Sequence, residues 1–119
     1  MDRKKILIID DEIDICLLVS SILKKEGHET LTAHSLVEGE HKFVEFNPQI
    51  VFLDLNLPDG VGFSIIPKLK KINASIKIII VSAYDGIKER MEANDHGIQY
   101  FLNKPLNRNE VLKTIDRLN

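Results

Sequence analysis

The sequence has little cysteine, no long hydrophobic run and no excess of basic charge. A single cysteine, Cys16, cannot form an internal disulfide, and such a chain is typical of a reducing compartment, so we expect a cytoplasmic location. The first apolar run, residues 6–9, is too short for a signal peptide or a membrane span. We therefore expect no membrane association and a mature chain that comprises the whole sequence.

The charged residues nearly balance, with 16 lysines and arginines against 18 aspartates and glutamates and a formal net charge of −2. Proteins that bind nucleic acid through their overall charge are basic, and those that bind an anionic membrane surface carry a lysine-rich block. The sequence has neither feature, so we expect no direct contact with nucleic acid. Its 119 residues are typical of one domain, which we expect to cover residues 1–119.

Short runs rich in isoleucine, leucine and valine recur along the chain. They are continuous rather than alternating, which is typical of central parallel strands that are covered on both faces. The predicted strands are residues 5–9, 50–53 and 77–81, with two weaker ones at 29–33 and 99–102.

The first predicted helix covers residues 13–26, and Gly27 stands where a left-handed residue would end it. Its predicted buried face consists of residues at helical spacing, namely Ile13, Cys16, Leu17, Ser20 and Leu23.

Capping signals mark the starts of two more helices. Ser35 is followed by Glu38, and Asn107 by Glu110, at the spacing of a capping box. Further helices are predicted at residues 61–72 and 86–96. Pro67 falls inside the former, where it predicts a kink or a late start. Five strands thus alternate with five helices, which predicts a doubly wound α/β domain with a five-stranded parallel sheet.

Polar residues follow four of the predicted strands. In doubly wound sheets the functional groups gather at the carboxyl ends of the strands. We expect five side chains at this edge: Asp10 and Asp11 after the first strand, Asp54 after the third, Ser82 after the fourth and Lys104 after the fifth.

These residue types suggest phosphoryl chemistry. Three carboxylates within roughly 5 Å would repel by about 3 kcal/mol per pair at an effective dielectric near 20, and a divalent cation relieves that repulsion. Ligation by oxygen alone suits Mg²⁺. With the metal and Lys104 supplying positive charge, Asp54 could attack a phosphoryl group and form an acyl phosphate, and Ser82 could donate a hydrogen bond to it.

Each motif also has an ordinary structural interpretation. Acids after the first strand favour a helix N-terminus, and we assign Glu12 and Asp14 to that role. A lone serine is usually a cap, and a lone lysine is usually solvated. The coincidence of four motifs at successive strand ends favours a common site. The four histidines show no paired ligand spacing and are expected at the surface: His28, His34, His41 and His96.

The stretches IIDDE, VFLDLNLPDGVGF, VSA and FLNKP, in this order and spacing, resemble the receiver domain of two-component response regulators over essentially the whole chain. The resemblance implies a flavodoxin-like sheet of strand order 2-1-3-4-5. It implies that Asp54 accepts a phosphoryl group from a sensor histidine kinase or a histidine phosphotransfer protein. It further implies that Asp10 and Asp11 position Mg²⁺, with Mn²⁺ as a substitute.

The resemblance implies roles for further residues. The backbone carbonyl of Asn56 would be a metal ligand, and Ser82 and Lys104 would contact the phosphoryl group. Ser82 and Phe101 would form a conformational switch that changes the face made by the fourth helix, fifth strand and fifth helix, where a downstream protein would bind. The peptide bond before Pro105 would be cis. Two residues would tune the lifetime of the phosphate, namely Asn56 and Tyr84.

The helix predicted at residues 86–96 has few large apolar anchors, chiefly Ile87 and Met91, so we expect it to pack loosely. Loose packing would make it a suitable moving part of the switch. The expected oligomeric state is a monomer or a weak dimer.

Alternative classes are less well supported. A haloacid-dehalogenase-like phosphatase, which also forms an aspartyl phosphate, needs a second aspartate two residues after the nucleophile, where Asn56 stands, so we do not expect an enzyme. A flavodoxin-like cofactor protein would need a hydroxyl- and glycine-rich loop where Asp10 and Asp11 stand. The sequence leaves open whether the domain is a free-standing regulator or a receiver excised from a longer response regulator or hybrid kinase.

Overall fold

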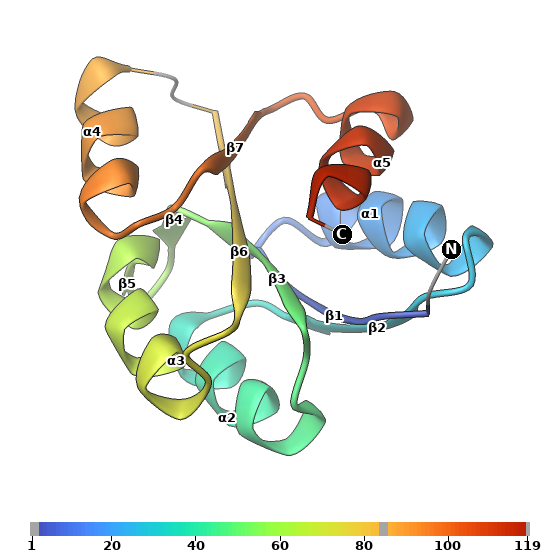
Figure 1. Ribbon diagram of the computed structural model, residues 1–119, viewed down its shortest axis with the longest axis horizontal. Helices are drawn as coiled ribbons and strands as arrows, with labels where there is room; N and C mark the ends of the chain where they lie inside the picture. Colours follow the sequence, from blue (N-terminus) through green and yellow to red (C-terminus); the bar gives the residue numbers. More distant parts are fainter. Residues whose placement is uncertain (1–2, 84–85, 119) are drawn as a thin grey trace.

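The computed structural model describes residues 3–83 and 86–118, and these residues form a parallel five-stranded sheet of order β2-β1-β3-β6-β7 (Figure 1). The predicted sheet and its strand order are confirmed. The strands are β1 Lys5–Ile9, β2 Glu29–Ala33, β3 Ile50–Asp54, β6 Lys77–Ser82 and β7 Tyr100–Asn103. The helices are α1 Ile13–Lys25, α2 Leu36–Phe46, α3 Ile66–Ile72, α4 Ile87–Asp95 and α5 Arg108–Arg117.

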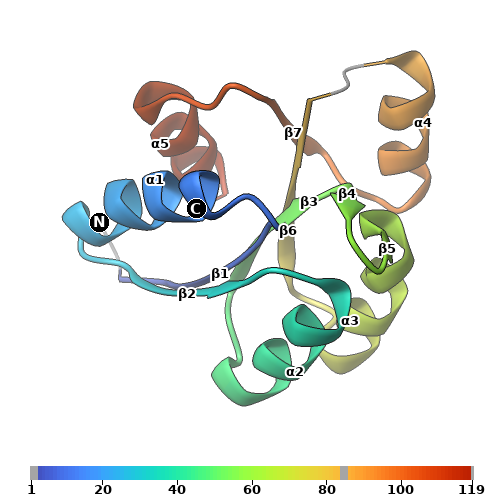
Figure 2. The same cartoon turned by 180° about the vertical axis from the view of Figure 1, so that it is seen from behind.

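Two helical layers cover the sheet, with α1 and α5 on one face and α2, α3 and α4 on the other (Figures 1 and 2). Successive residues of β1 alternate between the two cores: Ile6 and Ile8 pack with α1 and α5, whereas Leu7 and Ile9 pack on the opposite side. Because both faces of the central strands are buried, the interior positions of β1, β3 and β6 are apolar, as their continuous pattern predicted, whereas the edge strand β2 is half-buried and carries polar residues.

The capping residues predicted from the sequence begin both helices. The Ser35 hydroxyl accepts a hydrogen bond from the Glu38 backbone N–H at 3.1 Å, and the Asn107 side-chain oxygen accepts one from the Glu110 backbone N–H at 2.9 Å. Gly27 has a φ of +89°, the left-handed conformation expected after α1.

The third helix starts later than predicted, at Ile66, and Pro67 lies in its first turn, where a missing N–H costs little. The preceding residues form a small antiparallel hairpin, β4 Asn56–Leu57 and β5 Gly60–Val61, and the 3₁₀ helix η1 Gly62–Ile65. The Gly62 backbone N–H donates to the Leu55 carbonyl at 2.7 Å, and a Cβ at Gly62 would lie 2.2 Å from the Asp54 carbonyl oxygen. The chain therefore stays close to the end of β3 at Gly62 before α3 begins.

The predicted buried face of α1 is wrong at Ile13 and Leu17, which are more than half exposed. The helix lies beside the edge strand β2, where the Ser20 and Thr30 hydroxyls share a hydrogen bond at 2.8 Å. The side of α1 that carries Ile13 and Leu17 faces outward at this edge. The face that is buried consists of Cys16, Val19, Ser20, Ile22 and Leu23.

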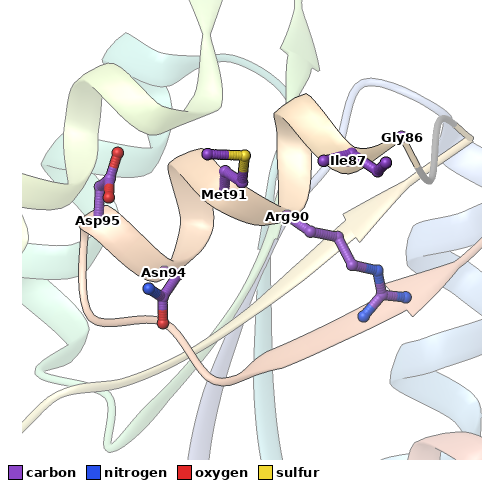
Figure 3. Close-up of a pocket in the computed structure, with 6 residues that line it drawn as sticks. All are labelled: Gly86, Ile87, Arg90, Met91, Asn94 and Asp95. Carbon is purple, nitrogen blue, oxygen red and sulfur yellow. The ribbon is translucent and has the colours of Figure 1, made fainter.

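The predicted anchors of α4 are also wrong, because Ile87 is 81% and Met91 62% exposed. Both side chains line a groove on the outer side of α4, together with Arg90 and the end of the helix (Figure 3). The buried residue of α4 is Ala93, whose methyl group packs on the core. Helical spacing alone did not reveal that the small residue, rather than the large ones, faces the sheet.

One histidine departs from the expected surface location. His28 is buried between α1 and β2, and its Nδ1 accepts a hydrogen bond from the Lys4 backbone N–H at 3.1 Å. His34 and His96 are half-buried, His41 is exposed, and the His96 ring stacks on Phe63 with a centroid separation of 5.4 Å. Among the described residues, no helix has the length and apolar character needed to cross a membrane.

Candidate functional site

Three aspartates meet at the carboxyl ends of β1 and β3. Asp10 follows β1, Asp11 is the next residue, and Asp54 is the last residue of β3. One carboxylate oxygen from each lies within 4.8 Å of the others, so the group could hold a cation. Asp10 and Asp54 are buried, whereas Asp11 is exposed. The parallel pairing of β1 with β3 brings these sequence-distant residues together.

Local hydrogen bonds orient the two buried carboxylates. Asp10 Oδ1 accepts from the Glu12 backbone N–H at 2.8 Å, and Asp54 Oδ1 accepts from the Asn56 backbone N–H at 3.2 Å. Each aspartate thereby shapes the loop that follows its own strand. Asp10 Oδ2 is buried and makes no well-directed hydrogen bond with the described residues, and the Lys104 ammonium lies 3.1 Å from it. A buried carboxylate oxygen that lacks a well-directed hydrogen bond is a suitable ligand for an oxygen-coordinated divalent ion.

The cation closest to these acids in the described part of the chain is the Lys104 ammonium. Its Nζ lies 2.7 Å from Glu12 Oε1, 3.1 Å from Asp10 Oδ2 and 3.5 Å from Asp54 Oδ2. Burial lowers the pKa of Lys104, but the hydrogen bond to Glu12 and the charges of Asp10 and Asp54 outweigh it, so the pKa lies above its ordinary value. Lys104 is therefore charged at neutral pH.

Lys104 is held in place by the backbone at the end of β7. Its backbone N–H donates to the Ser82 carbonyl at 2.8 Å, which joins the ends of β6 and β7. The peptide bond between Lys104 and Pro105 is cis.

The site carries more negative than positive charge. Burial, and next the charge of Asp10, raise the pKa of Asp54 to about 6. One ammonium faces three aspartates and Glu12 in this part of the described structure, so the ionised form of Asp54 is costly in the absence of a further cation. The arrangement favours binding of a divalent ion at neutral pH.

Ser82 and Asn56 lie beside the acidic cluster. Ser82 is the buried last residue of β6, next to β3 in the sheet, and it lines a groove that Asn56 and Lys88 also line. The Asn56 side chain is exposed. This groove gives access to the edge of the sheet from the side of α4.

Phe101 is not in the acidic cluster. It lies on β7, half-buried against the core shared with α2 and α3, and the Arg90 guanidinium of α4 lies 4.6 Å from its ring centroid. Tyr84, predicted to tune a phosphate lifetime, lies outside the described residues.

Glu12 was missed as a site residue, because its position after two aspartates was interpreted as a helix-dipole effect. Glu12 occupies the N-cap position of α1, but its side chain makes no capping hydrogen bond there. Its carboxylate instead pairs with Lys104, which lies 92 residues away. The only sequence signal was the presence of a third acid in the same loop.

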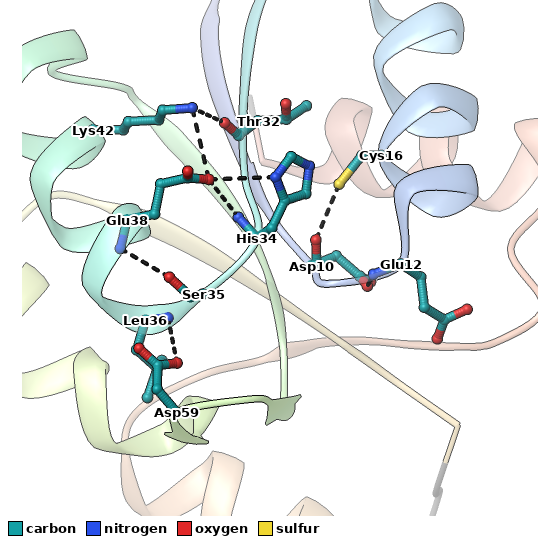
Figure 4. A network of polar contacts seen from close by, with 10 residues as sticks. All are labelled: Asp10, Glu12, Cys16, Thr32, His34, Ser35, Leu36, Glu38, Lys42 and Asp59. Atoms are coloured by element: carbon teal, nitrogen blue, oxygen red, sulfur yellow. Dashed lines mark hydrogen bonds and ion pairs between the residues drawn. The ribbon is translucent and has the colours of Figure 1, made fainter.

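The loop after Asp54 and the core beneath Asp10 are also fixed by polar contacts (Figure 4). Asp59 accepts hydrogen bonds from the first backbone N–H groups of α2, from Leu36 at 2.8 Å and from Val37 at 3.0 Å. The Cys16 thiol donates to the Asp10 carbonyl at 3.3 Å, and burial raises the pKa of this thiol to about 11. Cys16 is therefore a protonated core residue beneath the site.

Comparison with known proteins gives consistent matches. Residues 6–116 match the family model of the response regulator receiver domain. The sporulation initiation phosphotransferase F of Bacillus subtilis is 28% identical over 117 residues, which cover 98% of this chain and 94% of that protein. The DNA-binding dual master transcriptional regulator RpaA of Synechocystis is 31% identical over 116 residues, which cover 96% of this chain but 48% of that protein.

The fold matches equally well. The crystal structure of a CheY-like response regulator receiver domain protein from Methanospirillum hungatei superposes with a TM-score of 0.91 at 29% identity, covering 98% of this chain and 94% of the other. The chain therefore spans nearly all of some relatives and about half of others.

Proposed function

The chain belongs to the response regulator receiver family, and on this basis we propose that it is a phosphoacceptor of a two-component system or phosphorelay, phosphorylated on Asp54. Receiver domains are signalling domains rather than enzymes of the usual kind. The observation that carries the proposal is the meeting of Asp10, Asp11 and Asp54 with the Lys104 ammonium at one edge of the sheet. We assign this role to a single domain that comprises residues 1–119.

Asp10, Asp11, Asp54 and the backbone carbonyl of Asn56 would hold Mg²⁺, or Mn²⁺ in its place. The buried Asp10 Oδ2, which makes no well-directed hydrogen bond with the described residues, supports this ligand set. The ligand set also consists of oxygen atoms alone, which suits Mg²⁺. When bound, the metal supplies positive charge that balances the carboxylates and the incoming phosphoryl oxygens.

The transfer step uses the Asp54 carboxylate as nucleophile. An Asp54 oxygen attacks the phosphorus of a phosphohistidine, a new O–P bond forms, and the N–P bond to the imidazole breaks. The Lys104 ammonium and the Ser82 hydroxyl are assigned to the phosphoryl oxygens, whose charge they offset. A sensor histidine kinase or a histidine phosphotransfer protein is the proposed donor.

The signal would reach a downstream protein through α4, β7 and α5. Ser82 would move toward the phosphoryl group, and Phe101 would turn into the space that it leaves. The attachment of α4 through Ala93 supports this part of the proposal, because a helix with one small buried residue is displaced at little cost. The partly exposed Phe101, covered by Arg90, is suitably placed to report such a movement.

Phosphorylation is tested by intact-protein mass spectrometry after incubation with a small phosphodonor, such as acetyl phosphate, and Mg²⁺. We expect a phosphoryl adduct on the wild-type protein that is lost in Asp54→Asn. Asp59→Asn is the matched control, since Asp59 lies in the same loop and bonds α2 instead, and it should be labelled normally. An unlabelled wild-type protein, or equal labelling of Asp54→Asn, would contradict the proposal.

The switch is tested separately with beryllofluoride, which mimics an acyl phosphate. In the presence of Mg²⁺ it should shift the backbone amide NMR signals of Ser82, of residues 86–97 and of Phe101. If these signals stay unchanged while the mimic binds near Asp54, the proposed route to the α4 face is wrong.

A further inference from the structure

The closest contact of the Lys104 ammonium is not with a member of the aspartate cluster. Its Nζ lies 2.7 Å from Glu12 Oε1, the distance of a strong charge-assisted hydrogen bond, but 3.1 Å from Asp10 Oδ2 and 3.5 Å from Asp54 Oδ2. The Lys104 side chain is 10% exposed and the Glu12 side chain 58% exposed. Lys104 thus reaches from the buried site outward to a carboxylate at its rim.

The Glu12 side chain has no other role among the described contacts. The residue begins α1, yet its carboxylate accepts no capping hydrogen bond from the helix. Its backbone N–H, by contrast, donates to Asp10 Oδ1 at 2.8 Å, so the backbone of Glu12 is fixed next to the cluster. The direction of the side chain toward Lys104 is therefore determined by the ion pair.

A metal ion would weaken the contacts of Lys104 with Asp10 and Asp54. A divalent cation held by those two carboxylates would repel an ammonium group a few ångströms away and would compete with it for their oxygen atoms. The contact with Glu12 faces no such competition, since Glu12 is not one of the three clustered acids. Glu12 would then be the main anionic partner of Lys104 until a phosphoryl group arrives.

We propose that Glu12 is a positioning residue that holds the Lys104 ammonium at the rim of the site and competes with the phosphoryl group for it. This inference rests on the proposed function. The inference adds to that function a residue, Glu12, that determines how readily the Lys104 ammonium moves toward the phosphorylated aspartate. Weakening the Glu12 contact makes Lys104 more available and stabilises the phosphorylated form.

The test compares the affinity of wild-type protein and Glu12→Gln for beryllofluoride at saturating Mg²⁺, measured by NMR titration. A partly exposed ion pair changes an equilibrium by about two- to fivefold, so the variant should bind the mimic about two- to fivefold more tightly. Asp14→Asn is the matched control. It removes one acid from the first turn of the same helix, where Asp14 is exposed, and should leave the affinity unchanged.

A double-mutant cycle assigns the effect to Lys104. In a Lys104→Ala background, Glu12→Gln should no longer tighten binding, because the group for which Glu12 competes is absent. If the same tightening persists there, the effect is a general one of charge and the proposed competition is refuted.

A second readout does not involve the loaded site. In metal-free buffer the ¹⁵N-labelled ammonium of Lys104 should give an NMR signal that is protected from exchange with water by its ion pairs. Glu12→Gln and Glu12→Ala should broaden or abolish that signal, whereas Asp14→Asn should preserve it. An unchanged signal in both Glu12 variants would show that Glu12 does not hold Lys104.

The outcomes separate this inference from the proposed function. A wild-type protein that binds neither Mg²⁺ nor beryllofluoride contradicts the phosphoacceptor function. A wild-type protein that binds both, together with a Glu12→Gln variant of equal or weaker affinity, leaves that function intact and overturns the role of Glu12.

Discussion

Replacing the proposed phosphoacceptor should stabilise the metal-free protein. Asp54 is buried beside Asp10, and burial first and the charge of Asp10 second raise its pKa from an ordinary value of 3.8 to about 6. At neutral pH the native state therefore carries a carboxylate that is costly to keep ionised. Asp54→Asn removes the charge but retains a side-chain oxygen that can accept the hydrogen bond from the Asn56 backbone N–H.

The magnitude follows from the pKa difference. A shift of roughly two pKa units corresponds to about 3 kcal/mol at about 1.36 kcal/mol per unit, which is the upper limit of the gain. The pKa of about 6 already includes the compensating charge of Lys104, and solvent at the rim screens the remaining repulsion, so we expect Asp54→Asn to raise the free energy of unfolding by about 1–2 kcal/mol.

The gain should depend on pH in a defined direction. Asp54 binds its proton more tightly in the native state than in the unfolded chain, so ionisation penalises the native state alone. The penalty is absent below the unfolded pKa of 3.8, grows as pH rises to about 6 and is constant above that. The difference between Asp54→Asn and wild type should therefore be largest at pH 7.5 and small at pH 4.

Urea unfolding in the presence of a metal chelator, at pH 7.5, 6 and 4, measures this difference. Asp59→Asn is an informative control, because hydrogen bonds from the backbone of α2 lower the pKa of Asp59. Loss of the Asp59 carboxylate should therefore destabilise the protein at neutral pH, the opposite of the effect expected for Asp54→Asn. The reasoning is refuted if Asp54→Asn is no more stable than wild type at pH 7.5, or if its gain is the same at pH 4.

Three further predictions concern the supporting structure. His28 is buried and its pKa is lowered, mainly by burial, so its contribution to stability should be complete above pH 6.5 and lost as the pH falls through its lower native pKa. In urea unfolding, His28→Gln should remove this acid-induced loss of stability, whereas the exposed His41→Gln should show the same loss as the wild type. Asp59→Ala should speed hydrogen exchange of the first amides of α2, measured by NMR, while amides in α5 keep their wild-type rates. Leu23→Ala should lower the free energy of unfolding by about 2–5 kcal/mol, because Leu23 is fully buried. Leu17→Ala should change it by less than about 1 kcal/mol, because Leu17 is exposed. Equal effects of the two variants in chemical denaturation would contradict this assignment of the buried face of α1.

Elements that depend on neighbouring residues were predicted well. The capping pairs that begin at Ser35 and Asn107 are confirmed, because a cap is a hydrogen bond across three residues and is encoded locally. The strands were predicted within one residue at their ends. For the central strands the reason is that burial on both faces leaves a continuous apolar run. The gathering of Asp10 and Asp54 followed from the general geometry of parallel sheets.

Features that depend on where a helix lies were predicted poorly. Periodicity identifies residues that share a helical face, but the sheet decides which face is covered. Ile13 lies on the side of α1 that faces outward at the edge strand, and Ile87 lies on the outer side of α4. The burial of His28 likewise depends on how the end of α1 meets β2, a contact that is not visible in the local sequence.

The sequence by itself determined the type and order of the elements and the edge at which the acids gather, because hydrophobic periodicity and caps are local properties and parallel strands share one carboxyl edge. Only the tertiary structure decided which of these groups pair. Glu12 and Lys104 meet across 92 residues because β1 and β7 end at the same edge and the side chains are long enough to reach each other. Such a pair depends on distances in space, which no spacing along the chain encodes.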